Sequence, residues 1–167
     1  MDYRLIVATL AAAVRSGTPI LFAVLGEIMT ERAGVLNLGL EGLMLIGALS
    51  GFMAAYLSSN LWFAVLIAML MGGLFSLLFA VLTVTLKANQ VVSGLALTMM
   101  GTGLTAFIGK DYIGKTAVRF QNFSLPLLGE IPFLGPILFN QDWLVYITYL
   151  LVPLSWYYIF HTRWGME

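Results

Sequence analysis

The polar residues with the greatest potential for chemistry lie in one stretch of otherwise apolar sequence, residues 31–42. The stretch carries three charges, an asparagine and three glycines, and apolar runs precede and follow it. A charge at the centre of a membrane helix costs about 2.5–3.5 kcal/mol on insertion scales, so such groups usually face a protein interior or a water-filled path. The pattern predicts a broken or kinked helix beside a translocation path, formed by Glu31, Asn37, Gly39, Glu41 and Gly42.

The same stretch also fits a short connection between two spans, in which the charges contact water. Glu27 and Glu31 lie four residues apart on one helix face, where like charges repel. Two ionised carboxylates in lipid are too costly, so this helix end must be hydrated, paired or partly protonated. The sequence leaves both interpretations open.

A second polar group follows the longest apolar run, at residues 87–93. Asn89 fits the N-cap of the next helix, with contact to a ligand as the alternative, and Gln90 and Ser93 complete a polar helix entry. A connection of four residues, 87–90, also predicts that the helices on either side are antiparallel neighbours.

No residue pattern supports catalysis or a bound metal. The chain has no cysteine and one histidine, His161, which excludes thiol chemistry and a histidine cluster. It lacks a glycine-rich phosphate loop, so we expect no nucleotide hydrolysis by this chain. Ser93 lacks the pattern of a serine elbow, and Asp111 and Asp142 lie outside the predicted spans, which disfavours an intramembrane protease. We therefore predict a protein that is not an enzyme and has no cofactor.

The composition decides the class of protein. Of the 167 residues, 60% are hydrophobic and only 10% are charged, and the mean hydropathy is +0.95. Soluble domains carry about 25% charged residues. The net charge is zero and the basic residues are scattered, so nothing indicates a nucleic-acid partner. The chain is predicted to be an integral membrane protein.

Charge-poor runs predict an all-α, polytopic protein with about five membrane-spanning helices. A span needs about 20 residues. Thr18 fits an N-cap and Pro19 the first helical position, which predicts that the first span begins at residues 17–19. The apolar run before it is too short to span, so we expect an interfacial helix or a tilted span with Arg15 snorkelling. The predicted spans lie at 17–30, 36–56, 61–86, 91–109 and 143–160.

Glycines within these runs predict where helices pack closely, because a small residue lets two backbones approach. One pair in the second span has the small-xxx-small spacing, and further glycines lie in the third and fourth spans. These residues are Gly47, Gly51, Gly72, Gly73, Gly94, Gly101 and Gly103.

Residues 110–142 differ from the rest of the chain in their charges and prolines. The segment 125–129 is nearly repeated by 131–135, and each copy contains a proline. Proline at this density is incompatible with a regular helix, and loops of this length are usually functional. We predict a Pro-rich surface loop within a single transmembrane domain that covers residues 1–167.

Residues 31–48, with the pattern Glu-Arg-Ala-Gly-Val-Leu-Asn-Leu-Gly-Leu-Glu-Gly-Leu-Met-Leu-Ile-Gly-Ala, resemble the membrane-spanning permease subunits of ABC importers. The branch they resemble most serves nucleosides and simple sugars and is related to ribose and branched-chain amino-acid permeases. Residues 87–97, 131–139 and 162–165 resemble the same branch. The resemblance therefore covers nearly the whole chain.

The resemblance implies a multi-pass transport subunit in the plasma membrane. In such importers an extracellular substrate-binding lipoprotein delivers a small molecule to two permease subunits, and separate ATP-binding subunits drive alternating access. Family members are longer and carry an ATPase docking segment after the Arg-Trp-Gly element. The resemblance thus implies an N-terminal half, either a fragment or the product of a split gene.

A non-transporting membrane assembly or a channel is the alternative function. Neighbouring genes for an ATPase, a second permease and a binding protein would favour transport. Placing Arg163 inside, as the resemblance implies, leaves Lys110, Lys115 and Arg119 outside, against the usual positive-inside bias. The residues do not specify the substrate or whether the paired permeases are identical.

Overall fold

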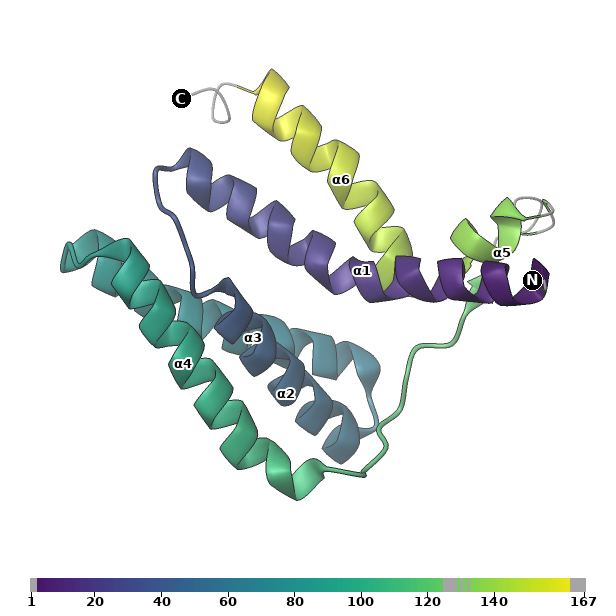
Figure 1. Ribbon diagram of the computed structural model, residues 1–167, viewed down its shortest axis with the longest axis horizontal. Helices are drawn as coiled ribbons and strands as arrows, with labels where there is room; N and C mark the ends of the chain where they lie inside the picture. Colours follow the sequence, from purple (N-terminus) through teal and green to yellow (C-terminus); the bar gives the residue numbers. More distant parts are fainter. Residues whose placement is uncertain (1–2, 125–128, 130, 132, 163–167) are drawn as a thin grey trace. The chain divides into compact units, whose positions relative to one another are not determined.

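A computed structural model describes residues 3–124, 129, 131 and 133–162 (Figure 1). Within these residues, five helices are long and apolar enough to cross a membrane. The prediction of an all-α polytopic protein with about five spans is confirmed. The helices are α1 (Tyr3–Arg32), α2 (Leu40–Ser58), α3 (Leu61–Ala80) with the π-helix η1 (Val81–Thr85), α4 (Gln90–Gly109) with the 3-10 helix η2 (Lys110–Tyr112), and α6 (Trp143–His161).

The predicted interruption near residues 31–42 is present. α1 ends at Arg32, α2 begins at Leu40, and the residues between them are not helical. Gly34 has a φ of +78°, in the left-handed region that glycine adopts without steric cost. We refer to residues 33–39 as the helix break.

α1 is longer than the sequence predicted, and the expected helix start at residues 17–19 is wrong. The helix continues through Pro19, and the Thr18 hydroxyl donates to the Val14 carbonyl at 3.1 Å instead of capping a new helix. Proline removes one backbone N–H and bends a helix without necessarily ending it. Figure 1 shows that α1 changes direction along its length.

Three helices begin at a side chain that caps their first backbone N–H groups. Asn60 accepts from the first turn of α3, and Asn89 accepts from Val91 and Val92 of α4 at 3.0 and 3.2 Å. Asp142 accepts from the first turn of α6. The prediction that Asn89 is a cap is confirmed.

The chain forms two compact units, one of residues 27–119 and the other of residues 1–26 with 120–167. In the first unit α2 packs against both α3 and α4, whereas α3 and α4 contact each other much less. α3 and α4 run in opposite directions, as the short connection predicted (Figure 1). The main packing partner of α4 is nevertheless α2, because glycines on both helices allow their backbones to meet.

The glycine pair of α2 has its packing partner within the chain. A Cβ built at Gly51 would lie 3.1 Å from the Ala68 Cβ, and one at Gly47 would lie 3.6 Å from the Ala68 carbonyl oxygen. The predicted close packing therefore occurs against α3. At Gly72, Gly73 and Gly103 an added Cβ would meet no described atom within 4 Å, so the tight contacts expected there are not formed.

In the other unit, the strands β1 (Phe123–Ser124) and β2 (Asn140–Gln141) pair antiparallel, with Phe123 opposite Gln141. The short helix α5 (Leu134–Leu138) lies between them in sequence. Pro136 fits there because the first turn of a helix has no intrahelical partner for its N–H groups. Residues 125–128, 130 and 132 of the predicted near-repeat, and residues 163–165, lie outside the described residues.

The connectivity of the spans predicts a labelling pattern. Ser59 follows α2 and Gln121 follows α4, so two helices separate them, whereas Ala88 is one helix away from each. We expect single cysteines at Ser59 and Gln121 to react with an impermeant maleimide from one side of the membrane and a cysteine at Ala88 from the other. Reaction of Ser59 and Ala88 variants from the same side would contradict this topology.

Candidate functional site

The buried polar group of the helix break is Asn37, whose side chain is 6% exposed. Its carboxamide oxygen accepts from the Gly39 N–H at 2.9 Å, and its own N–H donates to Glu27 Oε1 at 2.9 Å. The other oxygen of Glu27 accepts from the Thr30 hydroxyl at 3.1 Å. Glu27 is therefore paired, while Glu31 one turn later is exposed. Two hydrogen bonds stabilise the Glu27 carboxylate, in line with the expectation that this helix end is hydrated, paired or partly protonated.

The first turns of α4 hold the helix break in place. The Gln90 amide donates to the Gly34 carbonyl at 3.3 Å and accepts from the Leu36 N–H at 2.9 Å. The Thr98 hydroxyl lies 3.0 Å from the Leu38 carbonyl. Backbone groups of a non-helical segment inside apolar surroundings need such partners. We call these three contacts the α4 clamp.

Glycines bring the helix break and the start of α2 into backbone contact with α4. A Cβ at Gly39 would lie 2.8 Å from Leu97 Cδ2, and one at Gly42 would lie 2.7 Å from the Leu97 carbonyl oxygen. From the opposite side, a Cβ at Gly94 would lie 2.9 Å from the Gly39 nitrogen, and one at Gly101 would lie 2.7 Å from the Gly42 Cα. At Gly42, Gly94 and Gly101 the added Cβ would meet backbone atoms, so only glycine fits and these three residues serve close helix packing; at Gly39 it would meet the Leu97 side chain.

The structure thus brings together the two polar groups that the sequence singled out. Of the predicted path residues, Asn37, Gly39 and Gly42 are buried, whereas Glu31 and Glu41 are exposed. Glu41 lies in the first turn of α2, where a carboxylate interacts favourably with the helix dipole. In the predicted helix entry, Asn89 is exposed, Gln90 is half-buried and Ser93 is buried.

Sequence reasoning missed Thr98. A threonine in an apolar helix commonly donates to the carbonyl four residues earlier, and Thr98 also lies 3.2 Å from the Gly94 carbonyl. The available signal was its position one turn after Gly94, a residue already predicted to lie in a tight contact.

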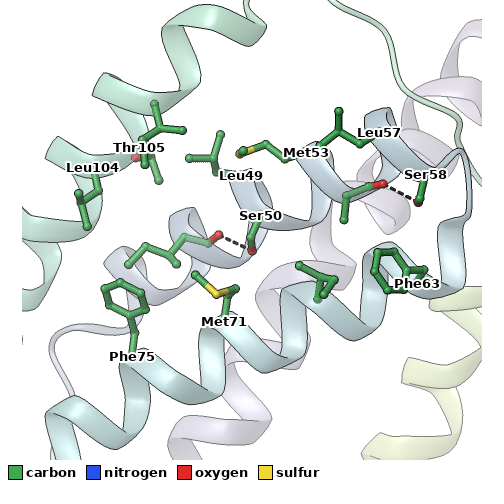
Figure 2. Close-up of a pocket in the computed structure, with 14 residues that line it drawn as sticks. Leu49, Ser50, Met53, Leu57, Ser58, Phe63, Met71, Phe75, Leu104 and Thr105 are labelled. Atoms are coloured by element: carbon green, nitrogen blue, oxygen red, sulfur yellow. Dashed lines mark hydrogen bonds between the residues drawn. The ribbon is translucent and has the colours of Figure 1, made fainter.

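A cavity of about 540 Å³ lies between α2, α3 and α4 (Figure 2). Its walls are almost entirely apolar. The hydroxyls of Ser50, Ser58 and Thr105 donate to carbonyls of their own helices, at 2.8, 2.6 and 2.8 Å. Because these hydroxyls are already bonded, the cavity suits apolar groups better than a hydroxyl-rich solute. Among the residues that the structure describes, no three carboxylates or histidines are grouped so as to hold a metal ion.

The arrangement defines a class: an integral membrane protein that has, among its described residues, five helices long and apolar enough to cross a membrane and a polar helix break held by α4. Residues 9–167 match the family described as "Branched-chain amino acid transport system / permease component", and the chain belongs to this family. Membership and the five apolar helices together make it a multi-pass plasma-membrane protein.

Curated relatives agree with this assignment. The chain is 38% identical over 162 residues to a putative glucose ABC transporter permease protein of Haloferax volcanii, covering 95% of this chain and 49% of that protein. It is 38% identical to the guanosine permease protein NupQ of Bacillus subtilis (89% and 50% covered), and 34% identical to the nucleoside permease protein NupC of Lactococcus lactis (90% and 51%). The chain thus spans about half the length of these relatives. No solved structure matches significantly.

The glycine contacts predict an unequal response to two alanine substitutions on α4. Gly101→Ala should lower the free energy of unfolding by about 1–3 kcal/mol, because the new methyl group would overlap the α2 backbone. Gly103→Ala meets nothing within 4 Å and should leave stability unchanged or raise it by up to about 1 kcal/mol through helix propensity. Thermal unfolding of the purified variants in detergent measures both; equal stability would exclude the backbone contact.

Proposed function

We propose that this chain forms part of the membrane-spanning permease subunit of an ATP-driven importer for nucleosides or simple sugars. The observation that carries the proposal is the family match over residues 9–167. It is supported by similarity to three permease proteins named for glucose, guanosine and nucleosides. The substrate class follows from those names and is a proposal for this chain.

The proposed importer contains further subunits. This chain has no phosphate-binding loop, so ATP hydrolysis belongs to a separate ATP-binding subunit. A second permease subunit would complete the path, and an extracellular substrate-binding lipoprotein would deliver the substrate. We expect this chain to bind the substrate only weakly, because a conduit must release what it binds.

We further propose that the translocation path runs beside the helix break, nearest to Glu31, Asn37, Gly39, Glu41 and Gly42. The two glutamates are exposed. Asn37 is buried and the two glycines face α4 in the described conformation, so their contact with substrate requires the α4 clamp to open during transport. Hydroxyl groups of a sugar or nucleoside could then bond to backbone groups that Gln90 and Thr98 release.

Substitution of Asn37 tests the role of the helix break. Asn37→Leu removes the acceptor for the Gly39 N–H, and in a complete importer we expect about a tenfold loss of substrate flux. Asn37→Ser is the matched control, because its short hydroxyl can still accept a local backbone N–H. Membrane insertion and ATPase assembly should persist in both variants. Normal uptake by Asn37→Leu would assign the stretch to a connection without a part in the path.

Reconstitution tests the proposed function directly. Vesicles that contain this chain alone should take up neither guanosine nor glucose. Uptake should appear only when the remaining half of the permease, the ATP-binding subunit, the binding protein and ATP are all present. Uptake by the isolated chain without ATP would favour a channel over an importer.

A further inference from the structure

Gln141 is the most deeply buried polar side chain described, with an exposed fraction of 0%. Its amide nitrogen donates to the Ala11 carbonyl of α1 at 3.1 Å and to the Ile137 carbonyl of α5 at 2.7 Å. Its amide oxygen accepts from Arg15 Nη2 at 3.2 Å. One side chain thus joins the middle of α1 to α5.

Arg15 links this amide to the start of α6. Its Nε lies 3.8 Å from Asp142 Oδ2, while Asp142 Oδ1 accepts from the Val145 N–H and caps α6. This is the only ion pair found within 4.0 Å among residues 3–124, 129, 131 and 133–162. An arginine within a predominantly apolar helix is costly and commonly marks a functional position.

α5 cannot fix its own position. It has five residues, and a helix this short is unstable unless tertiary contacts support it. Its contacts with other elements are mainly to β2, the strand that contains Gln141. A tilted contact between the rings of Phe133 and Tyr3, with centroids 6.0 Å apart, also joins the start of α5 to α1. Among the described residues few links therefore hold α5 to α1, and one of them is the Gln141 amide, which bonds to one carbonyl of each helix.

Tyr146 fixes the strand that carries Gln141. Its hydroxyl accepts from the Gln141 N–H at 3.3 Å and donates to the Phe123 carbonyl of β1 at 2.7 Å. The backbone of Gln141 is thus held by α6 and β1, while its side chain reaches α1 and α5. Such a residue can transmit a change at one of these segments to the others, because its bonds cannot all persist if one segment moves.

We propose that Gln141 is a positioning residue for transport: it docks α5 on α1, and Arg15 couples this docking to the Asp142 cap of α6. The proposal rests on the proposed importer function. The docked α5 is the arrangement in which the importer moves its substrate. Loss of the amide leaves the Ile137 and Ala11 carbonyls and the Arg15 guanidinium without this partner, so the docked arrangement becomes less populated.

The first experiment measures docking without reference to transport. The chain has no cysteine, so a Tyr3→Cys/Phe133→Cys pair provides its only thiols. In membranes that contain the full permease, a bifunctional thiol reagent should cross-link this pair readily when Gln141 is present. Adding Gln141→Leu should lower the rate about tenfold, in line with the loss of buried hydrogen bonds. An unchanged cross-linking rate would overturn the docking role, whichever substrate the importer transports.

The second experiment measures guanosine and glucose uptake by the reconstituted importer. Gln141→Leu should lower uptake about tenfold while ATP hydrolysis continues, because substrate movement and hydrolysis become uncoupled. Asn140→Ala is the matched control, since Asn140 is the exposed neighbour on the same strand and should leave uptake unchanged. Cross-linking the cysteine pair in the Gln141→Leu background should restore uptake. If it does not, the residue acts on general stability and the proposal is wrong.

Arg15→Lys keeps the proposal testable if Gln141→Leu assembles poorly. Lysine retains the charge opposite Asp142 but lacks the planar fork that reaches two partners. We expect this variant to assemble normally and to show reduced uptake and slower cross-linking. Failure of the unmodified importer to move either solute would refute the proposed function alone, because the cross-linking result still decides whether Gln141 docks α5.

Discussion

The close approach of α2 to α4 is the contact on which the unit of residues 27–119 depends. Lipid gives apolar helices little reason to associate, so small residues that permit backbone contact decide which faces meet. At Gly42 and Gly101 the two backbones are so close that a Cβ added to either glycine would lie 2.7 Å from a backbone atom of the other helix. From the same helix α4, Gln90 and Thr98 reach the helix break.

Each unit contains a glutamine whose side chain bonds to backbone groups of other segments. Gln90 bonds to both a carbonyl and an N–H of the helix break, and Gln141 bonds to two carbonyls and a guanidinium. A primary amide combines donors and an acceptor without a charge, so it meets both backbone needs at a lower desolvation cost than a carboxylate or an ammonium. This explains why an amide and a hydroxyl of α4 bond to the helix break, while Glu31 and Glu41 remain exposed.

The spans and the Asn89 cap were predictable because they depend on local sequence. Charge-free runs located the helices, and Asn89 was correctly identified as a cap. Pro19 misled the prediction because the same residues fit a helix start and a proline bend. The continuous α1 is supported by contacts of Ala11 and Arg15 with Gln141, which lies 126–130 positions away in the sequence. The glycines indicated close packing but not the partner helix, and the path assignment of Asn37 is still a prediction that no contact tests.

In the proposed transport cycle, the strength of the α4 clamp is suited to reversible opening. Three neutral hydrogen bonds contribute about 0.5–1.5 kcal/mol each. Their sum is smaller than the roughly 5.5 kcal/mol by which a ligand must favour one state to invert a two-state equilibrium from 1:99 to 99:1. The glycine faces add contact without interlocking side chains, so α2 and α4 can shift without rotamer changes at Gly42 and Gly101. The apolar cavity offers a solute no comparable set of releasable polar groups, because its hydroxyls bond within their own helices. A hydroxyl-rich substrate therefore gains more from the helix break than from the apolar cavity.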